Sequence, residues 1–225
     1  RGPSVTIEVT SEIPMAAGLG SSAAASVAGL RVFERITGAL GDSELLGLAT
    51  QAEGHADNAA PALFGGLNSV IEVEGALPYA LRWSWPQDLR LVVATPVVGL
   101  ATAKARAALP REVPRSDAIF NMQRVLALVH ALQQGHYDRL REAVKDRLHQ
   151  TARSSLVPLL RDALALEDPD MLGAFLSGAG PSVALLTRGD ATHVARRLSS
   201  MYERAGVDAT RSEERRVGKE CTEQC

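Results

Sequence analysis

A glycine- and serine-rich segment at residues 14–24 has the residue types that bind phosphate groups. Gly18 and Gly20 lack a Cβ, so the backbone can approach a ligand closely there. The segment runs into an alanine-rich stretch typical of a helix, and the first N–H groups of a helix attract anions. Ser21 and Ser22 add hydroxyl groups that can bond phosphate oxygens or a magnesium ion. The spacing matches neither a Walker loop nor a dinucleotide loop, and a glycine-serine helix cap without a ligand is the alternative.

A second group of polar side chains follows at Glu53, His55, Asp57 and Asn58. Glu53 lies seven residues after Leu46, so helical spacing places its carboxylate beside an apolar face. A carboxylate in such a place needs a partner or a metal, and hard cations such as Mg²⁺ prefer carboxylate oxygens. A salt bridge or a cap near the helix end would explain it without a metal. His55 and Asp57 could instead make only the local hydrogen bonds of a turn.

Two arginines, Arg106 and Arg153, stand in polar segments of the second half of the sequence. Thr102 lies one helical turn before Arg106, and Arg153 ends the segment DRLHQTAR at residues 146–153. A planar guanidinium suits a carboxylate because it can form two parallel hydrogen bonds with it. A solvated helix surface is the alternative for either arginine. The loop SGAGPS at residues 177–182, which contains Gly178, lies between two expected strands and could be a tight hairpin turn.

The order of these motifs is similar to that of the GHMP kinases, which act on galactose, homoserine, mevalonate and phosphomevalonate. PMAAGLGSSAA at residues 14–24 resembles their nucleotide-binding motif, and SGAGPS resembles their third motif. EGHADNAAPALFGG at residues 53–66 resembles the homoserine kinases in particular, as do TAKAR at 102–106 and DRLHQTAR at 146–153. The resemblance extends over about residues 3–209.

This resemblance implies an α+β, two-lobed fold. A lobe like ribosomal S5 domain 2, incomplete at its N-terminus, would occupy residues 1–88, and a ferredoxin-like α/β lobe residues 89–210. ATP and L-homoserine would meet between the lobes. The γ-phosphate of ATP would pass to the homoserine side-chain hydroxyl, with Mg²⁺ present, on the way to threonine. Two alternatives remain: another GHMP kinase that acts on a sugar or an isoprenoid alcohol, and a non-catalytic ligand-binding member of the family.

The resemblance also implies a role for each matching residue. Relatives similar to mevalonate kinase carry a catalytic Asp where this chain has Asn58, and a neutral amide cannot be a general base. Alignment of the substrate and charge neutralisation by Mg²⁺ would then carry the rate. The implied nucleotide-binding residues are Pro14, Ala17, Gly18, Leu19, Gly20, Ser21, Ser22, Ala23 and Ala24. The implied catalytic residues are Glu53, Asn58 and Thr102, the magnesium ligands are Ser22 and Glu53, and the substrate-binding residues are His55, Asp57, Arg106, Arg153 and Gly178.

Apolar spacing predicts the elements that position these residues. Strands and helices do not alternate regularly, which favours α+β over a doubly wound sheet. The spacing predicts strands at 5–9, 69–73, 79–83, 89–95, 173–177 and 182–187. It predicts helices at 21–36, 42–56, from 116, from 137, near 156–166 and at 190–205.

Composition limits the class of protein. The 225 residues are 46% hydrophobic and 22% charged, which is ordinary for a globular protein. The net charge of −2 offers no electrostatic footprint for nucleic acid, and no apolar run approaches the ~18–20 residues that span a bilayer. The only cysteines are Cys221 and Cys225, which excludes disulfides from the body and favours a cytoplasmic enzyme. Homodimers are common in the family, but no distinctive interface is visible in the sequence.

Both ends of the sequence are unusual. The chain starts without Met, whereas family members carry roughly seventy or more residues before the glycine loop. Residues 211–225 lack apolar periodicity, and RSEERRVGKEC resembles the translation of a sequencing-library adapter. We therefore expect an N-terminally truncated kinase followed by a non-native tail from Arg211; a charged native tail is the alternative.

Overall fold

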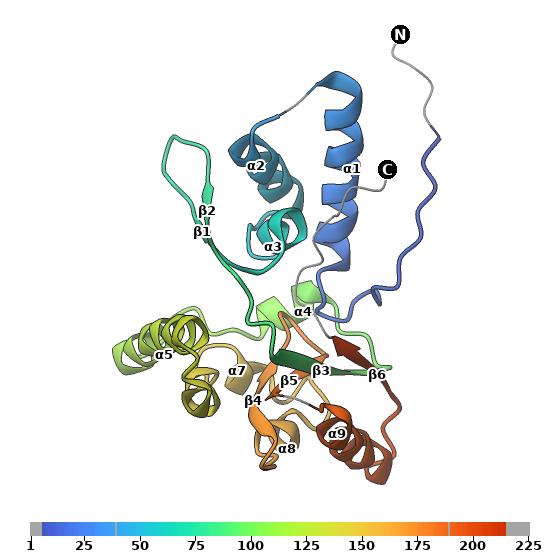
Figure 1. The fold of residues 1–225 in the computed structure, drawn as a ribbon, viewed down its shortest axis with the longest axis vertical. Helices are drawn as coiled ribbons and strands as arrows, with labels where there is room; N and C mark the ends of the chain where they lie inside the picture. Colours follow the sequence, from blue (N-terminus) through green and yellow to red (C-terminus); the bar gives the residue numbers. More distant parts are fainter. Residues whose placement is uncertain (1–5, 39, 189, 215–225) are drawn as a thin grey trace.

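The structure, a computed structural model, describes residues 6–38, 40–188 and 190–214. Its elements form an upper and a lower part in Figure 1. The first part contains α1 (Ser21–Thr37), α2 (Asp42–Glu53), α3 (Ala59–Phe64), β1 (Leu67–Ile71) and β2 (Tyr79–Trp83). The second contains β3 (Leu89–Pro96), α4 (Thr102–Ala107), α5 (Arg115–Gln134), the 3₁₀ turn η1 (Tyr137–Arg139), α6 (Leu140–Ala143), α7 (Gln150–Arg153), α8 (Leu160–Leu164), β4 (Met171–Leu176), β5 (Val183–Arg188), α9 (Thr192–Arg204) and β6 (Ala209–Glu214).

The N-terminal lobe packs three helices beside an antiparallel pair of strands, β1 and β2. Its core joins Val27 of α1 to Leu46 and Ala49 of α2 and to Ala59 and Ala60 of α3. Small residues at these contacts let the helices approach one another closely. This packing sets the start of α1 beside the end of α2, which brings the two main motifs of this lobe together (Figure 1).

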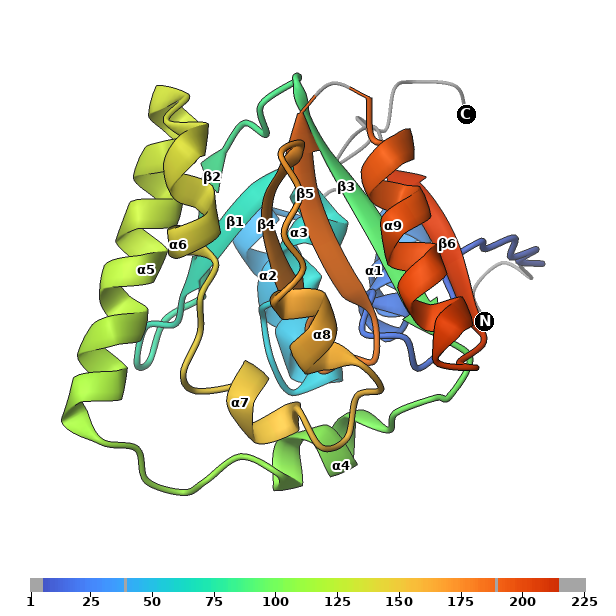
Figure 2. The same ribbon diagram turned by 90° about the horizontal axis from the view of Figure 1, so that it is seen from below.

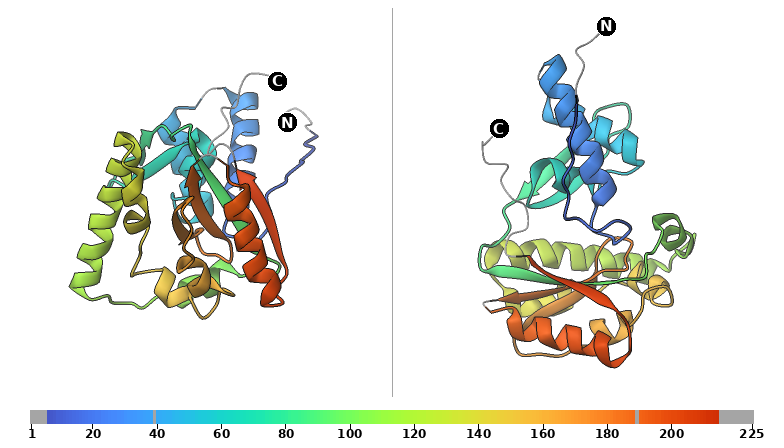
Figure 3. Two further views of the ribbon diagram at one scale, coloured as in Figure 1. Left: turned by 60° about the horizontal axis from the view of Figure 1, so that its bottom comes forward. Right: turned by 90° about the vertical axis from the view of Figure 1, so that its right-hand side faces the viewer.

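The C-terminal lobe is a four-stranded antiparallel sheet in the order β4-β5-β3-β6. Strand β3 alternates between two cores: Leu89 faces α5 and α6, whereas Val92 and Ala94 face α8 and α9. Figure 2 and Figure 3 show helices on both faces of the sheet. With its strands and helices in the order β-α-β-β-α-β, this lobe has the expected ferredoxin-like topology. The α+β, two-lobed prediction is confirmed.

Most predicted elements are present, but one predicted strand is absent and two predicted helices are shorter than expected. Residues 6–10 form no regular structure, so the strand expected at 5–9 is wrong for them, and Val5 lies outside the described residues. The helices expected from 137 and near 156–166 are shorter than predicted, namely η1 with α6, and α8.

Strand β6 was not predicted. Its backbone pairs with β3, from Ala209 opposite Pro96 to Glu214 opposite Leu91. The strand therefore continues four residues past Thr210, into the segment that resembles an adapter, and the origin of that segment stays a prediction. Cys221 and Cys225 lie outside the described residues. Within the described ranges, no helix has both the length and the apolar character needed to cross a membrane.

Candidate active site

A cleft of about 1090 Å³ is lined by residues of both lobes. It contains most of the residues that the sequence singles out, although they lie up to 161 positions apart (Ala17 to Gly178). Pro14, Leu19 and Ala24 belong to the same segment but do not line the cleft. The predicted residues that do line it are Ala17, Gly18, Gly20, Ser21, Ser22, Ala23, Glu53, His55, Asp57, Asn58, Thr102, Arg106, Arg153 and Gly178.

The glycine loop rests directly on the third motif. Gly18 has φ +74°, and a Cβ added to it would lie 2.4 Å from the Ser177 carbonyl oxygen and 2.7 Å from that of Gly180. The Ser177 hydroxyl donates to the Gly18 carbonyl oxygen at 2.9 Å, and the Ser182 N–H donates to the Ala17 carbonyl oxygen at 3.2 Å. The hairpin turn between β4 and β5 is thus also the support of the glycine loop.

The start of α1 offers N–H groups to an anion. Gly20 caps the helix with φ +73°, and no side chain caps it there. The first intrahelical bond runs from the Ala24 N–H to the Gly20 carbonyl oxygen at 2.9 Å, which leaves the preceding N–H groups of the first turn directed out of the helix end. With 17 residues, α1 also adds its dipole to this end. The residues present therefore fit a polyphosphate.

Glu53 ends α2 and faces the first turn of α1. Its Oε1 accepts hydrogen bonds from the Ser22 hydroxyl at 3.0 Å and from the Ser26 hydroxyl at 2.6 Å. Ser26 lies one helical turn after Ser22, so both hydroxyls reach the same oxygen. Sequence analysis assigned a role to Ser22 but not to Ser26, although the i, i+4 spacing of the two serines was visible.

This donor set fits Mg²⁺. One carboxylate and one hydroxyl stand beside a helix end that fits phosphates, and Mg²⁺ usually binds one or two carboxylates together with phosphate oxygens and water. The described residues contain no group of three or more His, Cys, Asp or Glu that could hold a metal by itself. Any ion held by Glu53 and Ser22 would therefore share its remaining ligands with the nucleotide and solvent.

His55, Asp57 and Asn58 make local hydrogen bonds at the edge of the cleft. One carboxylate oxygen of Asp57 pairs with His55 Nδ1 and accepts the Asn58 N–H at 2.9 Å. The turn described as the alternative is therefore present. All three residues nevertheless line the cleft, and the Asn58 side chain lies 3.6 Å from a Cβ built on Gly20. The amide of Asn58 is thus next to the glycine loop.

The C-terminal lobe supplies a cationic wall of the cleft. Arg153 is only 7% exposed, and it donates from Nε to the Ala105 carbonyl oxygen at 3.1 Å and from Nη1 to that of Gly178 at 2.9 Å. Burial lowers the pKa of Arg153; the carboxylate of Asp146 acts in the opposite direction, and the positive charge of Arg106 lowers it further. Arg106 is exposed to the cleft on α4, one turn after Thr102. Two neighbouring cations make this wall suited to an anionic group.

Comparisons with known proteins identify related sequences and folds. Residues 1–66 match the model of the GHMP kinase N-terminal domain, and residues 128–204 match that of the GHMP kinase C-terminal domain. The chain is 38% identical over 206 residues to the homoserine kinase of Moorella thermoacetica and covers 69% of that protein. The chain belongs to the GHMP kinase family.

Other relatives and solved structures show how much of each protein the similarity covers. The homoserine kinase of Gloeobacter violaceus is 46% identical over 197 residues, which cover 86% of this chain and 65% of that protein. The chain spans about two thirds of the length of the curated relatives it matches. The crystal structure of homoserine kinase from Cytophaga hutchinsonii has a TM-score of 0.84 at 26% identity, over 93% of this chain and 69% of that one. The crystal structure of L. major mevalonate kinase has a TM-score of 0.58 at 20% identity, over 89% of this chain and 67% of that one, which is a likeness of fold alone.

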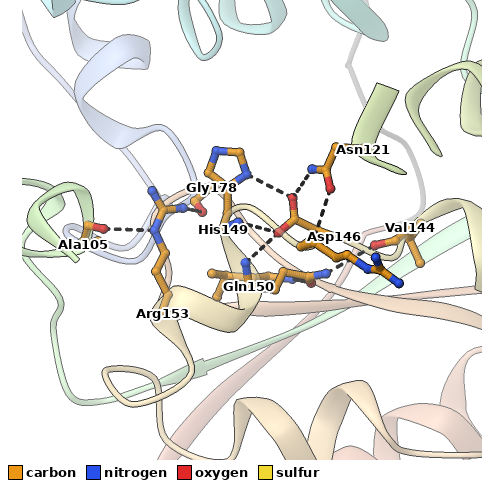
Figure 4. A network of polar contacts seen from close by, with 10 residues as sticks. Ala105, Asn121, Val144, Asp146, His149, Gln150, Arg153 and Gly178 are labelled. Carbon is orange, nitrogen blue, oxygen red and sulfur yellow. Dashed lines mark hydrogen bonds and ion pairs between the residues drawn. The ribbon is translucent and has the colours of Figure 1, made fainter. Parts of the chain in front are cut away.

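Four further residues of this GHMP kinase form a network that the sequence did not identify as part of the site (Figure 4). Asp146, His149 and Gln150 line the cleft, and Asn121 of α5 bonds to Asp146. The motif DRLHQTAR contains three of them, but its spacing does not tell which side chains face a ligand. Asp146 and Gln150 also line a second cavity of about 450 Å³, which contains none of the predicted site residues.

Proposed function

We propose that this chain belongs to a homoserine kinase, which transfers the γ-phosphate of ATP to the side-chain hydroxyl of L-homoserine. One observation carries the proposal: the cleft places the glycine loop and the Ser22–Glu53 pair in the same space as Arg106 and Arg153. The glycine loop suits phosphate, and the Ser22–Glu53 pair suits Mg²⁺. The two arginines suit the carboxylate of an amino acid. Relatives described as homoserine kinases, at 38–46% identity, support this choice among GHMP kinases.

The reaction is an in-line displacement at phosphorus. The hydroxyl oxygen of homoserine forms a bond to the γ-phosphorus, and the bond from that phosphorus to the β–γ bridging oxygen breaks. ADP leaves, and the hydroxyl proton passes to solvent. The N–H groups at the start of α1 hold the phosphates in place, while Glu53 and Ser22 would hold Mg²⁺. When bound, Mg²⁺ neutralises charge on the phosphate oxygens.

Positioning replaces a strong base in this proposal. Asn58 is a neutral amide beside Gly20, so it can orient a hydroxyl but cannot remove its proton. Arg153 has three N–H groups beyond the two that bond Ala105 and Gly178, and with Arg106 it would bind the substrate carboxylate. Holding the hydroxyl near the phosphorus can supply about 7 kcal/mol or more of the barrier reduction, since effective molarities are large.

We also propose the cellular context from the same resemblance. The product, O-phospho-L-homoserine, would be an intermediate of threonine biosynthesis. The reaction would take place in the cytoplasm, where ATP and Mg²⁺ are both supplied.

A substrate panel tests the proposal. Full-length protein that contains this chain is incubated with Mg²⁺-ATP and with L-homoserine, mevalonate or galactose, and products are followed by ³¹P NMR. A phosphate monoester is expected with homoserine, and Arg153→Ala should reduce its formation more than it reduces ATP binding. Phosphorylation of mevalonate or galactose in place of homoserine would contradict the substrate. An undiminished ATP turnover in Glu53→Ala would instead favour a role without this catalytic site.

A further inference from the structure

Helix α7, which carries Arg153, is too short to be stable by itself. It spans Gln150–Arg153, a single turn, whereas isolated helices need about 12–15 residues even in favourable sequences. Its orientation must therefore come from contacts with other elements. Because Arg153 is proposed to bind the substrate carboxylate, the residues that hold α7 determine where the free N–H groups of Arg153 point.

Asp146 holds the start of this turn. One of its carboxylate oxygens accepts the backbone N–H groups of His149 and Gln150, the latter at 2.8 Å. The other accepts His149 Nδ1 at 3.0 Å and the side-chain amide of Asn121 at 2.6 Å. Asn121 belongs to α5, and its own oxygen accepts the Arg147 N–H at 3.0 Å. Asp146 thus connects the start of α7 to the long helix α5 (Figure 4).

The charge of Asp146 is preserved inside this network. Its side chain is 17% exposed. Burial by itself raises the pKa of Asp146, but the hydrogen bonds from His149, Gln150 and Asn121 outweigh it and hold the pKa well below its usual range. The carboxylate is therefore an anion at neutral pH, and it opposes the positive charges of Arg153 and Arg106.

Gln150 holds the same turn from the side of the sheet. It is 8% exposed, and its Oε1 accepts the N–H of Leu176, the last residue of β4, at 2.8 Å. Two residues further on, the Gly178 carbonyl oxygen accepts Arg153 Nη1. Arg153 is thus fixed at the tip of its side chain by Gly178, and at its backbone by a turn that Gln150 and Asp146 hold.

We propose that Asp146 is a positioning residue for recognition of the substrate carboxylate, acting through α7 and Arg153. This inference rests on the proposed homoserine kinase activity and deepens it. Both carboxylate oxygens of Asp146 accept hydrogen bonds from the segment before α7 and from α5, so the role proposed for it is to hold Arg153 in place and not to act on the reacting atoms. Its loss should impair binding of the carboxylate and leave the phosphate end of the cleft unchanged.

A comparison of two acceptor alcohols tests this role. L-Homoserine carries the carboxylate, and 3-amino-1-propanol is the same molecule without it. In Asp146→Asn, we expect the KM for homoserine to rise about 10-fold to 100-fold, with kcat and the KM for ATP within about threefold of wild type, because uniform substrate binding is lost. The kcat/KM for 3-amino-1-propanol should stay within about threefold. On an Arg153→Ala background, Asp146→Asn should add little.

Two other variants complete the experiment. Asp117→Asn removes a carboxylate that bonds Arg147 of the same segment at 3.2 Å without contacting Asp146, and it should behave as wild type. Asn121→Ala removes one of the hydrogen bonds to Asp146, and it should raise the KM for homoserine about 3-fold to 10-fold even if Asp146→Asn does not fold.

The outcomes separate this inference from the proposed function. Equal losses for both alcohols, or an unchanged KM for homoserine in Asp146→Asn and Asn121→Ala, would mean that Asp146 only stabilises the fold and would overturn the inference. A wild-type protein that phosphorylates another alcohol but not homoserine would refute the proposed function itself, and the inference with it.

Discussion

Replacement of Gly18 by alanine should damage the glycine loop for two separable reasons. The first is backbone conformation: φ is +74°, and a left-handed conformation costs a residue with a Cβ about 1–2 kcal/mol. The second is space, since the added Cβ would lie 2.4 Å from the Ser177 carbonyl oxygen, whereas ordinary contacts begin near 3.4 Å. The loop or the hairpin turn must therefore move by about 1 Å. Overpacking of this kind costs about 1–3 kcal/mol, so the total loss of unfolding free energy is about 2–5 kcal/mol.

The displacement of the glycine loop should reduce the activity more strongly than the loss of stability does. A misplacement of about 1 Å can reduce a reaction rate about 100-fold, because the reacting groups are no longer aligned. We expect Gly18→Ala to lower kcat/KM for ATP by about that factor, measured in a coupled assay of ADP release. Urea unfolding followed by circular dichroism measures the stability loss.

Gly206→Ala is the matched control. Gly206 has φ +68°, and a Cβ added there meets no atom within 4 Å. The Gly206→Ala variant should therefore lose only the about 1–2 kcal/mol of unfolding free energy that the left-handed conformation costs, and it should keep normal activity. If Gly18→Ala keeps a kcat/KM for ATP within about threefold of Gly206→Ala, the close packing of the glycine loop on the third motif does not control catalysis, and the reasoning is refuted.

Three further predictions concern separate parts of the molecule. Glu53→Gln keeps the size of the side chain but removes its charge, so kcat should fall about 100-fold or more while calorimetry finds homoserine binding unchanged. Arg106→Ala should raise the KM for homoserine about 10-fold to 100-fold in steady-state assays and leave that for 3-amino-1-propanol unchanged. Burial raises the pKa of Tyr202 to about 12, so its ionisation does not affect the free energy of unfolding below about pH 10 but lowers it as the pH rises from 10 through 12. The Tyr202 hydroxyl is buried and finds no hydrogen-bond partner among the residues described, so Tyr202→Phe should raise the urea-derived unfolding free energy by about 1–2 kcal/mol and remove this alkaline loss.

The elements that sequence analysis predicted well are those whose apolar pattern is long or complete. The pattern of β3, Leu89–Pro96, is a compact apolar run because the strand is covered on both faces. Helix α1 was predicted to within a residue because a glycine stands at each end of its alanine-rich stretch. In contrast, α7 and α8 are single turns held by tertiary contacts, and so short a segment has no period to detect.

The strand β6 was missed for a different reason. Its first residues are short of apolar side chains, and the segment from Arg211 onward resembles a translated adapter and lacks apolar periodicity. Pairing of its backbone with β3 needs no particular side chains, because backbone N–H and C=O groups make the bonds. Composition therefore carried no signal for this strand.

The sequence alone predicted the chemistry of this protein's cleft. The types and spacing of residues 14–24 predicted an anion site, the place of Glu53 on a helix predicted a metal ligand, and the resemblance to the GHMP kinases implied that Arg106 and Arg153 bind a carboxylate. Only the tertiary structure decided how they meet. Ser177 bonds Gly18 across 159 residues, and Arg153 is aimed by the carbonyl groups of Ala105 and Gly178. Backbone carbonyls are present at every residue, so no sequence pattern distinguishes the two that accept Arg153. The same holds for Asp146, whose partners come from α5 and from its own segment, and whose role depends on where folding places them.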